Sequence, residues 1–243
     1  MREIIQGSSG LEKNGRCINS DHSKRFILKK LQQNLSKIEK ALTDHGLMST
    51  DLEAAIASLK AAIEKVPETV SKSLGGLTAP GELKTFPQGL ALYTDGACRG
   101  NPGPGSWACV AQNHDGQIIF ESCGHEILTT NNKMEIQAVI GALHQLEGFL
   151  LAHPMDQFKP IFLYTDSKYV CDGLNQWVMG WKSRGWKKAD GKAPENLELW
   201  QEIDLLKSRF PDVEIRWVKG HSGHPQNEYC DQLANRLLDD EGF

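Results

Sequence analysis

The stretch LALYTDGACRGNPGPG, residues 90–105, joins a short apolar run to a glycine-rich loop at a single acid, Asp95. The apolar run predicts a buried strand, and the glycines after it let the backbone approach a ligand closely. A second apolar run, residues 161–165, ends in the same way at Asp166. If these strands are neighbours, the two carboxylates repel unless a cation lies between them or one acid stays protonated. The two strand ends alone fit two unrelated turns or a functional site, and the glycine-rich loop after Asp95 favours the functional site.

Strands and helices alternate on either side of this stretch. Further strands are expected over residues 107–112, 117–123 and 213–218. Helices are expected over residues 132–150, 197–208 and 227–238. This alternation predicts an α/β or α+β sheet domain of roughly 150 residues, which we place at residues 89–243.

The chain before residue 89 has a different pattern. Leucine, isoleucine and valine recur every three or four residues over 28–42 and 52–66, which predicts two amphipathic helices. Thr50 and Glu53 have the spacing of a capping box at the start of the second helix. We therefore expect a helical hairpin within residues 1–67. Residues 68–88 are rich in Ser, Gly, Pro and Thr, which is typical of a flexible linker.

The hairpin has two candidate roles. Its apolar stripes are short for an independent coiled coil, so it needs a partner. Homodimerisation is the leading hypothesis, and packing on the sheet domain is the alternative. The first helix is also basic, which fits a solvated face or an auxiliary nucleic-acid contact. Its bases are Lys24, Arg25, Lys29, Lys30, Lys37 and Lys40.

Composition excludes several classes of protein. No run of about 18 apolar residues is present, and the first residues lack the apolar stretch of a secretory signal. Six cysteines are scattered without a CxxC pair, which disfavours a disulfide framework or a zinc site. We therefore expect a soluble cytoplasmic protein without a membrane partner. Residues 88–243 carry 14 Lys and Arg against 21 Asp and Glu, so any phosphate contact needs bases gathered locally.

Two further side chains stand in positions that suit chemistry. Glu135 falls in the first turn expected for the helix over residues 132–150, where a glutamate can also serve the helix dipole alone. His221 lies in a polar glycine loop, and this favours chemistry over core packing.

The motifs together resemble the ribonuclease H type 1 family over residues 89–240. The strings that carry the resemblance are YTDGACRGNPGPG, TTNNKME, YTDSKYV, QWVMGWKSRGWK and WVKGHSGHPQNEYCD, in family-like order and separation. The resemblance implies a five-stranded mixed sheet flanked by helices, with its first three strands antiparallel. It also implies endonucleolytic hydrolysis of the RNA strand in an RNA–DNA hybrid. By the matching motifs, the metal ligands are Asp95, Glu135, Asp166 and Asp231.

The implied chemistry is two-metal hydrolysis, which leaves 5′-phosphate and 3′-hydroxyl ends. Two Mg²⁺ ions suit a ligand set made only of carboxylates, and Mn²⁺ is expected to substitute. The resemblance places His221 near the metals, where its imidazole is expected to transfer a proton and assist product departure.

Substrate contacts follow from the same resemblance. The residues expected to touch the RNA strand, where 2′-hydroxyls distinguish it from DNA, are Cys98, Arg99, Asn101, Asn131, Asn132 and Lys168. Lys168 departs from the Gln of many family members, which favours a phosphate contact. Thr130 matches the family's phosphate-pocket threonine on the DNA strand. The segment 176–192, the basic protrusion, is expected to cradle that strand through Trp181, Lys182, Arg184, Trp186, Lys187 and Lys188, with Trp177 in a packing role.

Two other readings remain. The first is a hybrid-binding scaffold with an idle nuclease fold, which the complete set of acids disfavours. The second is a fragment of a reverse transcriptase, integrase or transposase, which the basic protrusion and the Gly220–Pro225 loop disfavour.

Overall fold

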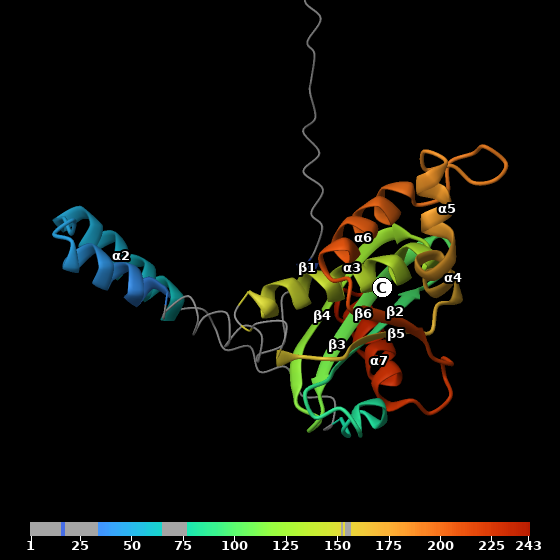
Figure 1. Ribbon diagram of the computed structural model, residues 1–243, viewed down its shortest axis with the longest axis horizontal. Coiled ribbons are helices and arrows are strands. Elements are labelled where there is room, and N and C mark those ends of the chain that lie inside the picture. The colour runs from blue at the N-terminus through green and yellow to red at the C-terminus, as the bar shows by residue number, and fades with distance from the viewer. Residues whose placement is uncertain (1–15, 18–33, 65–76, 152, 154–156) are drawn as a thin grey trace, which may run out of the picture.

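A mixed sheet forms the centre of the domain that spans residues 77–243 (Figure 1). The computed structural model describes residues 16–17, 34–64, 77–151, 153 and 157–243. The sheet order is β1-β4-β3-β2-β5-β6. Its strands are β1 (Arg16–Cys17), β2 (Leu90–Cys98), β3 (Gly103–Asn113), β4 (Ile118–Thr129), β5 (Ile161–Thr165) and β6 (Val213–Trp217). Strands β2, β3 and β4 are antiparallel, and β5 and β6 run parallel to β2. The five-stranded mixed sheet that the resemblance implied is confirmed.

Helices cover both faces of the sheet. They are α3 (Asn131–Leu150), α4 (Lys168–Asp172), η3 (Gly173–Trp177), α5 (Val178–Ser183), α6 (Leu197–Arg209) and α7 (Pro225–Asp240). Side chains of α3 and α6 share one apolar cluster with the sheet, and side chains of α7 share another. Figure 1 shows α3 and α6 together on one face and α7 on the other.

The alternation of side chains along β2 separates the two cores. Leu90 and Leu92 lie in the cluster with α3 and α6, whereas Ala91 and Tyr93 lie in the cluster with α7. All four are almost completely buried. A strand covered on both faces is apolar throughout, which explains the uninterrupted apolar run at residues 90–93.

Two features of the sheet domain differ from expectation. A sixth strand, β1, adds two residues to the edge of β4. Leu77, Leu83 and Phe86 pack on the domain, whereas the linker prediction extended to residue 88. Leu83, in the short helix η1 (Gly81–Leu83), is fully buried, and the carbonyl oxygen of Thr78 accepts a hydrogen bond from Gln226. The composition suggested a linker because Ser, Gly, Pro and Thr are common in linkers. Composition does not show the contacts that such residues make in the folded protein.

Two helices precede the sheet domain in the chain. They span residues 34–44 and α2 (Thr50–Glu64). Leu35, Ile56 and Ile63 form a small buried cluster between them, and Lys60 pairs with Glu39 at 2.5 Å. The residues expected in helices at 28–33 and 65–66, and the linker residues 68–76, lie outside the described part of the chain, as do Lys24, Arg25, Lys29 and Lys30.

The start of α2 differs from the predicted capping box. The hydroxyl of Ser49, and not that of Thr50, accepts a hydrogen bond from the Leu52 amide at 3.3 Å. The cap falls one residue earlier because two hydroxyl residues are adjacent and either can cap. Among the described helices, none is both long and apolar enough to cross a membrane.

Candidate metal centre and nucleic-acid interface

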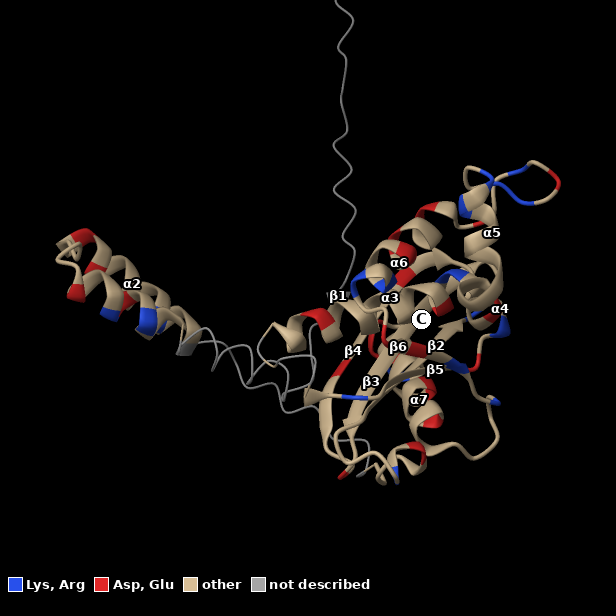
Figure 2. Ribbon diagram, viewed as in Figure 1, with Lys and Arg blue, Asp and Glu red and all other residues tan. Residues whose placement is uncertain are grey.

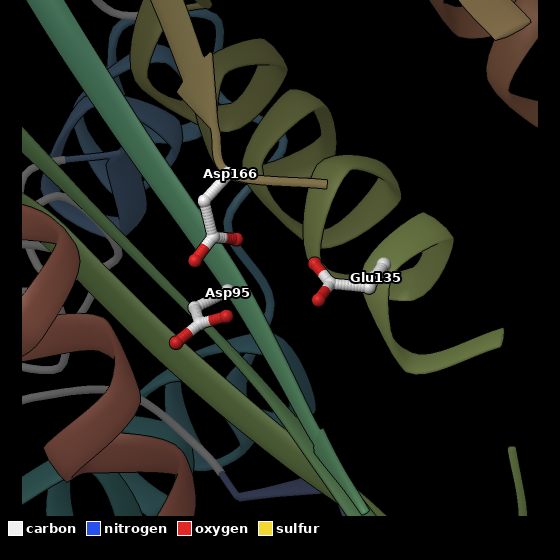
Figure 3. Close-up of side chains that lie close together, drawn as sticks. All are labelled: Asp95, Glu135 and Asp166. Atoms are coloured by element: carbon white, nitrogen blue, oxygen red, sulfur yellow. The ribbon is translucent and has the colours of Figure 1, made fainter. Parts of the chain in front are cut away.

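Three carboxylates converge where β2 and β5 lie beside α3. Asp95 lies within β2, Asp166 directly follows β5 and Glu135 lies in the first turns of α3. One oxygen of each side chain lies within 4.8 Å of the others. Figure 3 shows the three groups turned toward a common point. The expectation that the two Thr–Asp strand ends meet is therefore correct, because Thr94 and Thr165 are register partners.

Two glycines allow this convergence. A Cβ on Gly96 would lie 2.5 Å from the backbone nitrogen of Glu135, so a side chain there would push α3 away from β2. A Cβ on Gly220 would lie 2.3 Å from Oδ2 of Asp166. Glycine is therefore required at Gly96 for the close approach of α3 to β2, and at Gly220 for the close approach of the loop to the Asp166 carboxylate.

The carboxylates destabilise one another in their ionised forms. Burial, together with the charges of Asp166 and Asp231, raises the pKa of Asp95 to about 8. Burial and the charges of Asp95 and Asp166 raise the pKa of Glu135 well above its usual value. Burial is also the main cause of the raised pKa of Asp166. A cation placed among the three groups would remove this cost.

One oxygen at the centre is left without a partner. Oε2 of Glu135 is buried and makes no hydrogen bond within the described residues, while Oε1 accepts one from Asn131 at 3.4 Å. A buried carboxylate oxygen without a donor is costly, and a metal ion is the partner that its charge favours. The donor set consists of carboxylate oxygens, which suit Mg²⁺ or Mn²⁺.

Asp231 lies beside this cluster on α7. Its charge raises the pKa of Asp95, and its Oδ1 accepts a hydrogen bond from Asn235 at 2.8 Å. It lines the same cleft but is not part of the group of three within 4.8 Å. Asp231, the fourth predicted ligand, therefore lies in the same cleft as the three carboxylates but outside their close group.

The carboxylates lie in an open cleft of about 530 Å³. Six other residues predicted from sequence line it, namely Cys98, Arg99, Asn131, Asn132, Lys168 and His221. Asn101 and Thr130 lie at its edge, since Asn101 accepts a hydrogen bond from the Asn131 amide at 3.3 Å and Thr130 caps α3. The resemblance therefore grouped these residues as the structure does.

His221 projects from the exposed loop between β6 and α7. Its φ of 49° is uncommon for a residue with a side chain, and its neighbour Gly220 contacts Asp166. Electrostatic attraction links His221 to Asp166. His221 thus lines the same cleft as the carboxylates while it stays open to solvent.

Arg99 has protein partners that sequence did not indicate. Its guanidinium pairs with Asp239 and donates to the backbone oxygens of Asn235 and Phe243. These partners all belong to the end of α7 or the residues after it. Arg99 therefore ties the glycine-rich loop to α7, in addition to lining the cleft.

Lys168 and Trp217 flank the cleft beside Asp166. The ammonium of Lys168 lies 5.0 Å from the centre of the Trp217 ring. The indole of Trp217 in turn donates to the backbone oxygen of Asp166 at 2.9 Å. This stacked arrangement holds a positive charge at the rim of an otherwise acidic cleft.

The basic protrusion combines a packed base with exposed charges. Trp181 is buried against Trp200 and Trp177, so its predicted substrate contact is limited by packing. Lys182 pairs with Asp204 at 2.8 Å, and Arg184 donates to the Lys187 carbonyl.

A hollow of about 620 Å³ is lined by both aromatic and basic residues, including Trp177, Arg184 and Lys188. Trp186 packs partly against the core and Lys188 is half-buried, while Lys187 and residues 189–193 are exposed. Figure 2 shows Lys and Arg along the loop beyond α5.

Sequence reasoning missed Asn227 as a functional candidate. It is buried, and its side chain hydrogen-bonds Asp166, which lowers the pKa of that carboxyl. The available signal was its place in the same motif as Asp231, one helical turn earlier.

Comparison with known proteins agrees with this geometry. The RNase H family model matches residues 87–238. A ribonuclease H of Rhizobium etli is 48% identical over 148 residues, which are 61% of this chain and 90% of the relative. A ribonuclease HI of Caulobacter vibrioides is 48% identical over 149 residues, covering 61% and 92%. The crystal structure of LC9-RNase H1, a type 1 RNase H, superposes with a TM-score of 0.51 at 37% identity, covering 62% of this chain and 72% of that one.

The match to the family model covers more than half of the chain and includes all the acids of the cleft. The chain therefore belongs to the ribonuclease H family of metal-dependent endonucleases.

Proposed function

We propose that the protein hydrolyses the RNA strand of RNA–DNA hybrids by a two-metal-ion mechanism, leaving 5′-phosphate and 3′-hydroxyl ends. The observation that carries the proposal is the buried carboxylate cluster with the unpartnered Oε2 of Glu135. We assign Mg²⁺ as the resident metal, with Mn²⁺ as a substitute. Bound metal would activate water and neutralise the charge that develops on the phosphate and the leaving oxygen.

The residues of the chain have distinct roles in this proposal. Asp95, Glu135, Asp166 and Asp231 hold the metals. Asn227 orients Asp166 through the hydrogen bond to its carboxylate. His221, which also lines the cleft, gives or takes a proton as the product leaves.

Substrate is held at two places. In the cleft, Cys98, Arg99, Asn101, Asn131, Asn132 and Lys168 face the RNA strand, and the amides at the start of α3 with Thr130 receive a DNA phosphate. The basic protrusion contacts DNA phosphates through Lys182, Arg184, Lys187 and Lys188. Trp181 and Trp186 pack against the core and support these side chains.

The test is cleavage of a labelled RNA–DNA hybrid by wild type and Asp95→Asn, with Mg²⁺ and with EDTA. We expect metal-dependent cutting of the RNA strand alone, with a 3′-hydroxyl that a polymerase extends. Binding without cutting by the wild type would instead support an idle hybrid-binding scaffold, which the complete acid cluster disfavours.

We further propose that the enzyme acts in the cytoplasm and that its N-terminal hairpin, within residues 1–67, forms a homodimer. The thiols of Cys98, Cys109, Cys171 and Cys230 are unpaired, which fits a reducing compartment. Ile38, Leu52 and Leu59 are exposed on the two helices, which leaves apolar surface for a second copy. Sedimentation of the full chain and of an Ile38→Glu, Leu59→Glu variant tests this, and a monomeric wild type would overturn it.

A further inference from the structure

Residues 77–86 precede the part of the chain that the family model matches, yet they contact the loop that carries His221. We define this segment as the N-terminal strap. Its first anchor is Leu83, which is fully buried among Ala91, Tyr93 and Phe162. Its second is the pair Ala79 and Gly116, which approach so closely that a Cβ on Gly116 would lie 2.9 Å from Ala79. His114 adds a contact of 2.7 Å to the Leu83 carbonyl. The strap is therefore fixed to the sheet independently of the catalytic loop.

Glu82 reaches from the strap to His224. One carboxylate oxygen of Glu82 lies 2.6 Å from Nε2 of His224, and the other accepts a hydrogen bond from the Tyr93 hydroxyl at 3.0 Å. The hydrogen bond from His224 lowers the pKa of Glu82, so the carboxylate is ionised at neutral pH. Both side chains are mostly buried, at 25% and 20% exposed. A short hydrogen bond to an ionised carboxylate in this setting is weakly screened and favours one position of the ring.

His224 is a junction between the loop and α7. It precedes Pro225 at the first turn of α7, and its backbone oxygen accepts from Glu228 at 3.0 Å. Its ring lies 5.4 Å from that of Tyr93, and its Nδ1 is buried without a hydrogen-bond partner in the described chain. The Glu82 carboxylate is thus the polar contact that the structure provides for this ring.

The strap also holds the next residues of α7. Gln226 donates to the Thr78 carbonyl at 2.9 Å and to the Gln112 side chain at 3.0 Å. Asn227, which hydrogen-bonds Asp166, follows directly. On the other side of His224, three residues earlier, is His221 with its strained φ of 49°. A strained loop keeps one conformation only when its neighbours hold it.

We propose that Glu82 is a positioning residue, which fixes His224 and thereby holds the 219–224 loop so that His221 faces the carboxylate cleft. The inference rests on the proposed proton-transfer role of His221. Glu82 lies before residues 87–238, which the family model matches, and it is 142 positions from His224 in sequence.

The experiment compares Glu82→Gln with a matched control, Glu147→Gln, in the full-length protein. Glu147 also forms a 2.6 Å pair, with Arg209, but it joins α3 to α6 on the other face of the sheet. We expect Glu82→Gln to lower kcat about tenfold with KM nearly unchanged, because displacement of a catalytic group costs rate more than binding. In a His221→Ala background, Glu82→Gln should cause no further loss. Glu147→Gln should leave kcat unchanged.

Amide hydrogen exchange gives a readout that does not depend on activity. We expect Glu82→Gln, but not Glu147→Gln, to accelerate exchange in residues 220–223 by about tenfold or more. Equal kcat for the two variants, or an equal loss in the presence and absence of His221, would overturn the inference. If His221→Ala alone retains full kcat while Glu82→Gln still accelerates exchange, the proposed role of His221 fails and the strap's hold on the loop stands.

Discussion

The acidic cleft and the basic protrusion use charge in opposite ways. In the cleft, Asp95 and Glu135 are buried beside other acids, and one oxygen of Glu135 has no donor within the described residues. On the protrusion, most of the charges are exposed, such as Lys187, or paired on the surface, such as Lys182, and they lie beside packed tryptophans. Burial makes each charge of the cleft expensive, so a compensating ion is needed there. The exposed bases cost little and act by attracting phosphate.

We expect the largest effect on catalysis when one carboxylate oxygen of the cleft is replaced with an amide nitrogen. Asp95→Asn should reduce kcat by roughly 10³-fold or more, because a metal contributes several kcal/mol to the transition state. Affinity for hybrid, measured in Ca²⁺ to prevent cutting, should change little. If hybrid binding is lost together with cutting, Asp95 also contributes to binding. The proposed division between chemistry in the cleft and binding on the protrusion would then be wrong.

His221→Ala should have a smaller effect on the same step. General acid–base groups contribute about 10²-fold or more, so kcat should fall by roughly 10²-fold without reaching zero. The dependence of kcat on pH across the neutral range should also be weaker in this variant than in the wild type. Unchanged kcat across that range would count against proton transfer by this residue.

The protrusion should affect binding instead of chemistry. Replacing Lys187 and Lys188 with Gln should weaken hybrid binding about tenfold at moderate salt and reduce the slope of log affinity against log salt by about two. Saturating substrate should restore kcat to the wild-type value. A lowered kcat at saturation would mean that the protrusion also aligns the scissile phosphate.

The smallest expected effect is on stability of the metal-free protein. Burial and the neighbouring acids raise the pKa of Asp95 to about 8 in the folded state, from its ordinary value of 3.8. Between these values the folded state keeps a proton that the unfolded state has lost, so the free energy of unfolding falls as pH rises through the window. Metal-free Asp95→Asn should therefore melt several degrees higher than wild type at pH 8, with a smaller difference at pH 5. Saturating Mg²⁺ should reduce this difference in melting temperature, because bound metal stabilises the wild type.

Sequence patterns determined most of the sheet domain, for a physical reason. Strand β5 was predicted with its observed ends, and α3 and α6 to within one residue, because covered strands are apolar throughout and helices repeat their apolar face. The strand pattern also brought Asp95 and Asp166 together, since acids at the same end of neighbouring parallel strands lie close, and the resemblance added Glu135 from α3. Strand ends were less accurate where, as in β3 and β4, glycines and polar residues continue the pairing beyond the apolar run.

Other features depended on contacts between distant residues. Sequence reasoning placed Glu82 in a linker and made Arg99 a substrate contact only. The partners of these residues, His224 and Asp239, are 142 and 140 positions away. Local pattern records what a residue prefers, whereas an ion pair across the fold depends on where two surfaces meet. The sequence by itself thus determined the catalytic family and its acids, and the tertiary structure decided which other side chains hold those acids and the His221 loop in place.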